Sequence, residues 1–375
     1  MSWLTRTQLS ARGESGLGTP GLLIGAVPGE GFVPVSPQAR NLLRSRSAAT
    51  LAAAGIERGQ RVLLSLNSDG DLSGALLADA LVEVGASAAV VGPRGRMRTL
   101  AAFRALQPQV WITTPTGALD FLARLYLEFN VDPVELELDR ILIVGEIPSE
   151  GTERRLASEF EAQVAALYCD PIFGAAWAHA TEEKWQIQEP GVLGLGELAR
   201  DAWQGDDSLG EGLELVLRPD WPGPFEGTSI RTGQVTGRNP ASALFAHTIG
   251  EYLLVRGRWL SLPLLRRALS QIDGIAGFCV EIDRGQGTLD KLVLKLAFDR
   301  PGLVENPMWA ARAREAIAAV TPVDFILETA HAEDAAPRER ILDRRGHHLG
   351  VDRREAAARM ATAADERAAV GRELG

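Results

Sequence analysis

Residues 61–91 read RVLLSLNSDGDLSGALLADALVEVGASAAVV, and this segment indicates the fold most clearly. It begins with an apolar run at 61–66 and ends with another at 87–91. Short continuous apolar runs are typical of strands buried on both faces of a parallel sheet. Between them, Leu72, Leu76, Ala80 and Val84 are four apart, which puts their side chains on one helix face. The segment therefore predicts a strand–helix–strand unit.

The same alternation continues on the C-terminal side. Apolar runs at 109–113, 140–144 and 164–169 are expected strands, and Leu156 and Phe160 lie on one face of an expected helix. Repeated strand–helix units with buried strands predict a doubly wound α/β domain.

The second half of the chain has a different pattern. Residues 184–250 contain Gly/Pro/Asp turns and short β-like runs, which predict an irregular β-rich segment. From 252 onward the expected order is strand 252–256, helix 260–271, strands 276–283 and 291–298, helix 307–320 and strand 323–328. This βαββαβ order predicts a small ferredoxin-like α+β domain. We predict a large domain at 1–250, the small C-terminal domain at 251–346 and a charged helical tail at 347–375.

The composition narrows the classes of function. The chain has 375 residues, 46% of them apolar and 23% charged, as in soluble globular proteins. The net charge of −10 disfavours nucleic-acid binding. Two cysteines 110 positions apart predict neither a disulfide framework nor a zinc site, and no apolar stretch predicts a membrane span. Because the N-terminus also lacks an apolar leader, we expect a cytoplasmic protein.

Two GxGxxG/A stretches, at 16–21 and 194–199, lack the preceding strand and following helix that a dinucleotide site needs. We interpret both as surface loops. Residues 15–20 are the one candidate for a loop that binds phosphate through backbone N–H groups. The adjacent His347 and His348 are expected to be solvated.

The order of short segments along the chain resembles the phenylacetate-CoA ligase branch of the AMP-forming, adenylate-forming acyl-CoA ligases. The resemblance covers roughly residues 15–345 and includes the sequences SGLGTP (15–20), AAAGIERGQRV (52–62), TPT (114–116), GEIP (145–148), LY (167–168), GLELV (212–216), SIRTGQ (229–234), LVRG (254–257) and RILDRR (340–345). It implies ATP or AMP and CoA as ligands.

The resemblance also implies a role for individual residues. It assigns ATP or AMP binding to Ser15, Gly16, Gly18, Thr19, Tyr168 and Gln234. It assigns binding of the acid to Thr114, Pro115, Gly145 and Glu146, and catalysis to Asp170 and Arg338. No metal ligand is predicted.

Several positions depart from the family pattern. Thr19 stands at the phosphate-loop lysine, and Gln234 stands at the aspartate that binds the ribose. Cys169-Asp170-Pro171 replaces the segment that carries the Mg²⁺-binding glutamate, and Pro337 stands at the catalytic lysine, beside Arg338. Only Lys184, Lys291 and Lys295 are lysines, and none lies at a catalytic position.

We therefore predict an eroded ligase that binds an acyl or aryl carboxylate, its adenylate, another copy of the chain or a partner ligase, without efficient CoA-ester synthesis. The alternative is an active adenylating enzyme for an aromatic or polyketide-type acid, in which Asp170 or Glu182 holds Mg²⁺ and Arg338 supplies positive charge. A third alternative is a structural protein that senses a small molecule or dimerises.

Overall fold

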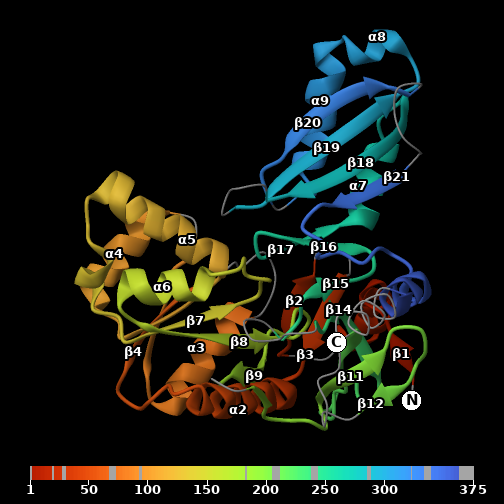
Figure 1. Cartoon of the computed structure of the whole chain (residues 1–375). Coiled ribbons are helices and arrows are strands. Elements are labelled where there is room, and N and C mark those ends of the chain that lie inside the picture. Colours follow the sequence, from red (N-terminus) through yellow and green to blue (C-terminus); the bar gives the residue numbers. More distant parts are fainter. Residues whose placement is uncertain are drawn as a thin grey trace, which may run out of the picture.

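The computed structural model (Figure 1) describes residues 2–18, 21–27, 31–66, 73–92, 95–181, 184–204, 212–237, 244–284, 289–321, 323–332 and 339–362. Its three larger sheets lie in consecutive parts of the chain, apart from a short N-terminal strand. No described helix is both long and apolar enough to cross a membrane.

A seven-stranded sheet forms the first part and confirms the predicted α/β class. Its order is β10-β9-β8-β7-β6-β4-β5, and the strands from β5 to β8 are parallel. Their bounds are β4 Arg61–Ser65, β5 Ser87–Val90, β6 Val110–Thr113, β7 Arg140–Val144, β8 Gln163–Cys169, β9 Ala176–Ala180 and β10 Trp185–Ile187.

Helices cover both faces of this sheet (Figure 1). Alternate strand residues point to opposite faces, so Leu64 and Ile112 join one apolar cluster while Leu63 and Trp111 join the other. The first cluster includes side chains of α2 (Pro37–Ala53) and α3 (Ser73–Val84). The second includes side chains of α4 (Arg96–Leu106), α5 (Pro115–Arg124) and α6 (Thr152–Phe160), and π-helical (Leu125–Phe129) and 3₁₀ (Pro133–Leu136) turns follow α5.

A six-stranded sheet follows and confirms the predicted β-rich segment. Its order is β1-β14-β13-β11-β12, with β15 paired to β14. The strands are β1 Trp3–Leu4, β11 Leu193–Glu197, β12 Trp203–Gln204, β13 Leu213–Leu217, β14 Ser229–Val235 and β15 His247–Thr248. The sequence did not predict β1, which pairs in parallel with β14 across more than 220 positions. The interpretation of residues 194–199 as a surface loop is wrong, because 194–197 lie in β11 and 194–196 are buried.

Short elements connect β1 to α2. They are the 3₁₀ turns Arg6–Gln8 and Glu14–Gly16, the helix α1 (Leu9–Gly13) and the hairpin of β2 (Leu23–Val27) and β3 (Gly31–Val35).

The C-terminal part is α+β, as predicted, with two differences in its strands: its sheet lacks the expected first strand and contains β21, which the sequence did not predict. Its sheet has the order β20-β19-β18-β21. The expected first strand does not join that sheet, because β16 (Tyr252–Val255) turns back at once and pairs with β17 (Arg258–Ser261) in a separate hairpin. The other elements are α7 Leu262–Ser270, β18 Ile275–Asp283, β19 Lys291–Phe298, α8 Pro301–Val304, α9 Pro307–Ala318, β20 Ile326–His331 and β21 Glu339–Asp343.

Residues 353–362 are helical, but the described part of the predicted tail is not a solvated extension. Ala356 is buried against the six-stranded sheet, and His348 is hydrogen-bonded to Thr248. The expectation that His347 and His348 are solvated is therefore wrong, since both are partly buried. The domain boundaries at 250 and 346 stay predictions.

Candidate functional site

Tyr168 on β8 and Gln234 on β14 lie against each other, although they come from different sheets. The Tyr168 hydroxyl donates a 2.8 Å hydrogen bond to Oε1 of Gln234, and both side chains are buried. Burial raises the pKa of Tyr168 well above its usual value, so the hydroxyl stays protonated and remains the donor. The structure brings these two residues together, and their role in binding ATP or AMP stays a prediction.

The free space around this pair is small. The cavity lined by Gln234 has a volume of about 70 Å³, and the one lined by Tyr168 has about 10 Å³. Pockets for small molecules typically start at roughly 300 Å³. Among the described residues, these two cavities are therefore each too small for a nucleotide.

Asp170 follows β8 and organises the turn into β9. Its Oδ1 accepts hydrogen bonds from the backbone N–H groups of Ile172 (2.8 Å) and Phe173 (2.6 Å). Its Oδ2 accepts from the N–H of Ala175 (3.1 Å) and from Nε1 of Trp177 (2.7 Å). A carboxylate has about four acceptor positions, and these contacts use them. Asp170 also lines the cavity at Gln234. Its predicted catalytic role, including Mg²⁺ binding in the alternative hypothesis, stays a prediction.

The two predicted acid-binding segments lie side by side. Thr114 caps α5 by accepting a 3.0 Å hydrogen bond from the N–H of Gly117, and Pro115 occupies the first turn, where its missing N–H costs nothing. Oε2 of Glu146 accepts from the Thr116 N–H (3.0 Å) and hydroxyl (2.6 Å). Burial raises the pKa of Glu146 to about 7, so the carboxyl is partly protonated near neutral pH.

Gly145 and Thr114 line the same small cavity as Gln234, whereas Pro115 and Glu146 line the cavity at Tyr168. The structure thus groups the predicted acid-binding residues with two of the predicted nucleotide-binding residues. Binding of an acid there stays a prediction.

The expected phosphate loop lies elsewhere. Ser15 and Gly16 form a 3₁₀ turn, in which the Ser15 hydroxyl donates a 2.7 Å hydrogen bond to the carbonyl of Arg12. A Cβ on Gly16 would lie 3.0 Å from Pro34 and Pro224, whereas Gly18 is exposed. Among the described residues that line the cavities at Tyr168 and Gln234, none belongs to 15–18. Thr19, Glu182 and Arg338 lie outside the described residues.

A larger cavity of about 310 Å³ opens at the carboxyl ends of β4 and β6. Strands β5 and β6 lie on opposite sides of β4, so the winding of the sheet reverses between β4 and β6. Doubly wound sheets bind ligands in the crevice at such a reversal. Ser65 and Thr113, the last residues of these two strands, line the cavity.

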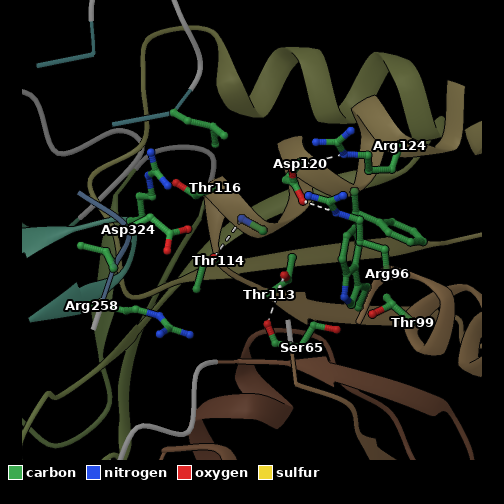
Figure 2. A pocket seen from close by; sticks show the side chains of 16 residues that line it. Ser65, Arg96, Thr99, Thr113, Thr114, Thr116, Asp120, Arg124, Arg258 and Asp324 are labelled. Carbon is green, nitrogen blue, oxygen red and sulfur yellow. Dashed lines mark hydrogen bonds and ion pairs between the residues drawn. The ribbon is translucent and has the colours of Figure 1, made fainter. Parts of the chain in front are cut away.

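The C-terminal part supplies the other wall of this cavity. Figure 2 shows Arg258 and Asp324 on one side and Arg96, Asp120 and Arg124 on the other. Since Arg258 belongs to the β16–β17 hairpin and Asp324 precedes β20, the cavity exists only in this arrangement of the two parts.

Two buried donors in this cavity have no partner among the described residues. They are the Ser65 hydroxyl and Nε1 of Trp111, and both residues are less than 3% exposed, at 2% and 1%. Leaving a buried donor unpaired costs about 1–3 kcal/mol, and a ligand recovers that energy only where its acceptor atoms reach the donor.

The charge of the lining favours an anion. Four arginines line the cavity, opposed by two aspartates: Arg96, Arg124, Arg256 and Arg258 against Asp120 and Asp324. Asp120 accepts from Nε of Arg96 at 3.3 Å and pairs with Nε of Arg124 at 3.7 Å. Glu128, beside the cavity, also pairs with Nη1 of Arg96 at 3.3 Å and with Nη1 of Arg124 at 2.8 Å. When Glu128 is counted, the four arginines face three carboxylates.

Sequence reasoning did not single out Ser65, Trp111, Arg96 or Arg258. The segments that contain these residues have no motif that indicates a binding site. The one sequence feature that could have located the cavity is the position of Ser65 and Thr113 at the ends of apolar runs. That signal identifies a site only when the order of strands in the sheet is known.

Among the described residues, no group of three or more His, Cys, Asp and Glu side chains could hold a metal ion. Neither Cys169 nor Cys279 forms a disulfide with a described residue.

No protein-family model matches the chain, and no curated protein matches it. Solved structures do match. One is 2-hydroxyisobutyryl-CoA ligase in complex with 2-HIB-AMP and CoA in the thioesterification state, with a TM-score of 0.71 and 14% identity over 91% of this chain and 80% of that chain. Another is the malonyl-CoA ligase ternary product complex with methylmalonyl-CoA and AMP bound, with a TM-score of 0.56 and 14% identity over 84% and 71%. A third is the amide bond synthetase McbA from Marinactinospora thermotolerans, with a TM-score of 0.60 and 13% identity over 83% of this chain and 65% of that chain.

The chain therefore shares its fold with these ligases, and the fold is the part of the resemblance in sequence that the comparisons show. Other structures of 2-hydroxyisobutyryl-CoA ligase match less well. The open conformation has a TM-score of 0.52 over 90% of this chain, and a postadenylation state has 0.53 over 92%. All three comparisons are with the same ligase at 14% identity, so their TM-scores differ because the parts of that ligase are arranged differently. The higher TM-score shows that this chain shares the arrangement of parts seen in the thioesterification state.

Proposed function

We propose that this chain is a ligase-like binding protein that holds a small acyl or aryl acid, as the free carboxylate or as its CoA thioester, in the 310 Å³ cavity. It does not synthesise CoA esters efficiently. The observation that carries this proposal is the contrast between the two regions: the described cavities at Gln234 and Tyr168, two of the residues expected to bind the nucleotide, have about 70 and 10 Å³, whereas the cavity at the ends of β4 and β6 is several times larger.

The chemistry of the residues present supports the loss of adenylation. Transfer of an adenylyl group needs positive charge on the phosphates, from Mg²⁺ or a lysine. Asp170 is committed to four hydrogen bonds within the protein, and Gln234 has a single amide oxygen, which already accepts from Tyr168.

The lining of the large cavity supports an acidic or carbonyl-bearing ligand. A carboxylate or thioester oxygen can accept hydrogen bonds from the Ser65 hydroxyl and Trp111 Nε1, and the arginines stabilise the negative charge of a carboxylate. The ring of Phe121 and the indole of Trp111 supply an apolar surface for an acyl or aryl group. Aryl acids are the class that the resemblance to phenylacetate-CoA ligases implies.

Calorimetry with phenylacetate, phenylacetyl-CoA, CoA and ATP tests this proposal, together with pyrophosphate exchange. We expect the acid or the thioester to bind, and ATP to give neither heat nor exchange. Ser65→Ala and Trp111→Phe should each weaken binding about tenfold, the equivalent of one hydrogen bond. Arg155→Gln, on the exposed surface of α6, is the control and should bind normally. Equal affinity in all variants would contradict the location.

The second candidate function is an active adenylating enzyme. It is favoured by the contact between Tyr168 and Gln234 and by the grouping of Thr114 and Glu146 around it. ATP binding accompanied by pyrophosphate exchange with an aryl acid would support this function and refute the first.

A further inference from the structure

Residues 344–362 leave the C-terminal sheet after β21 and return to the six-stranded sheet; we call them the strap. In Figure 1 the dark blue helix at 353–362 lies near β14 and β15, away from α8 and α9. The chain also passes from the six-stranded sheet to the C-terminal part at 249–251. The two parts are therefore joined by two stretches of backbone.

The strap pairs with the other connection through its backbone. The Thr248 N–H donates to the carbonyl of His347 (2.7 Å), and the Leu349 N–H donates to the carbonyl of Thr248 (2.9 Å). The Gly250 N–H donates to the carbonyl of Gly350 (2.9 Å). Gly350, at φ +106°, has a conformation that side chains disfavour, and from it the chain turns toward the helix at 353–362.

A buried carboxylate anchors the helix of the strap. Nε and Nη2 of Arg353 each lie 2.9 Å from an oxygen of Glu214 on β13, in a two-pronged ion pair. Nη1 of Arg231 on β14 binds the same carboxylate at 2.7 Å. Because the Glu214 side chain is fully buried, it needs positive partners, and the strap provides one of the two.

Apolar side chains complete the docking. Ala356 is 1% exposed and packs in one cluster with Leu198, Val235 and Ile249 of the large part. Leu349, Ala357 and Met360 add further contacts from the strap to this cluster.

The crossing from β21 to the docked segment is short. Asp343 ends β21, and His348 already pairs with Thr248. The intervening backbone spans at most roughly 18 Å when fully extended. Nη2 of Arg345 fixes the crossing further, because it donates to the carbonyl of Leu254 (3.0 Å) in the β16–β17 hairpin. A large rotation of the C-terminal part therefore requires the strap to undock.

We propose that the strap locks the C-terminal part in the observed arrangement and so holds Arg258 and Asp324 in the wall of the large cavity. This inference does not depend on which ligand the cavity takes. The lock gives the chain one stable arrangement, which it shares with the thioesterification state of 2-hydroxyisobutyryl-CoA ligase. That ligase is also seen in an open conformation and in a postadenylation state.

Distance measurements between two spin labels test the lock. Suitable sites are Val82→Cys on α3 and Met308→Cys on α9, which are 64% and 66% exposed, in a Cys279→Ser background. We expect one narrow distance distribution in the full-length protein. Arg353→Gln combined with Ala356→Glu should broaden it, because the variant removes the ion pair and buries a carboxylate. Arg354→Gln, at the exposed neighbour of Arg353, removes one positive charge without removing the ion pair to Glu214 and should leave it narrow.

A narrow distribution in the double variant, equal to that of the Arg354→Gln control, would overturn the proposal. If the double variant does not fold, amide hydrogen exchange of the unmodified protein decides the question. The amides of Thr248, Gly250 and Leu349 should then exchange as slowly as those of β13 and β14. Exchange at the rate of exposed turns would show that the strap does not hold the two parts together.

Discussion

Glu146 accepts both hydrogen bonds that Thr116 donates, and it does so in a site where burial raises the pKa of Glu146 to about 7. The folded state therefore binds this proton more tightly than the unfolded state, in which the pKa is near 4.5. The resulting stabilisation is complete below pH 4.5 and is lost as the pH rises through about 7, by about 3 kcal/mol in total. Glu146→Gln keeps an acceptor for Thr116 and removes the titration. Urea unfolding between pH 5 and 8 should show the variant gaining stability relative to the natural protein as the pH rises.

The control for this prediction is Glu57→Gln, because Glu57 is exposed. It should follow the natural protein at every pH. A constant difference between Glu146→Gln and the natural protein across this range would contradict the raised pKa.

Asp170 provides the next prediction, since its four hydrogen bonds assign it to the turn before β9. In Asp170→Asn, an N–H₂ group replaces one carboxylate oxygen and cannot accept hydrogen bonds. If it replaces Oδ2, the Ala175 N–H and Trp177 Nε1 lose their acceptor. Unpaired buried donors cost about 1–3 kcal/mol each, so we expect a loss of roughly 3 kcal/mol in the free energy of unfolding. The loss should be equal with and without Mg²⁺, because the carboxylate acts within the protein.

The exposed Asp139→Asn is the matched variant for this measurement and should change stability by less than about 0.5 kcal/mol. Stabilisation of the natural protein by Mg²⁺ that disappears in Asp170→Asn would instead assign Asp170 to a metal.

Local sequence was sufficient for the strands and helices of the large sheet. Runs such as residues 62–64 and 141–144 are apolar throughout because the strands are buried on both faces, and this pattern is visible without any knowledge of the fold. Tyr168 and Gln234 were also identified correctly as neighbours, through the resemblance.

The strap and the large cavity could not be predicted in this way. The pairing of Thr248 with His348 and of Glu214 with Arg353 joins residues 100 or more positions apart, whose own segments look like ordinary charged surface. Burial of the strap depends on only a few small or apolar residues, such as Ala356 and Leu349. Likewise, Ser65 lies in a cavity only because β6 crosses to the far side of β4.

Arg6 connects the N-terminal segment to the β16–β17 hairpin and leads to a third prediction. Its guanidinium lies 4.6 Å from the ring centre of Tyr252 and 4.2 Å from that of Trp259, and the side chain is buried. Cation–π contacts reach about 2 kcal/mol when they are desolvated. A double-mutant cycle of Arg6→Met and Trp259→Leu, measured by urea unfolding, should give a coupling energy of about 1–2 kcal/mol. The control cycle pairs Trp259→Leu with Arg12→Met, because Arg12 is exposed, and its coupling energy should be near zero.

The two histidines of the strap predict that acid loosens it. Burial, together with Arg345, lowers the pKa of His347 and of His348 to about 4, while Asp343 opposes the shift. Arg284 and Asp290 also act on His347, with opposite signs, and Arg359 lowers the pKa of His348. A released strap would bind these protons with pKa values near 6.5, so docking is strongest above that value and weakens as the pH falls toward 4.

Hydrogen exchange at pH 7.5 and 5.8, corrected for the intrinsic dependence on pH, measures this effect at the amides of Leu349 and Gly250. Their protection should fall at the lower pH in the natural protein and should change less in a variant that combines His347→Gln with His348→Gln. The amides of β4 are the internal reference, because they lie in the seven-stranded sheet, away from the strap. Protection of the strap that is equal at both pH values would mean that neither histidine gains a proton on release.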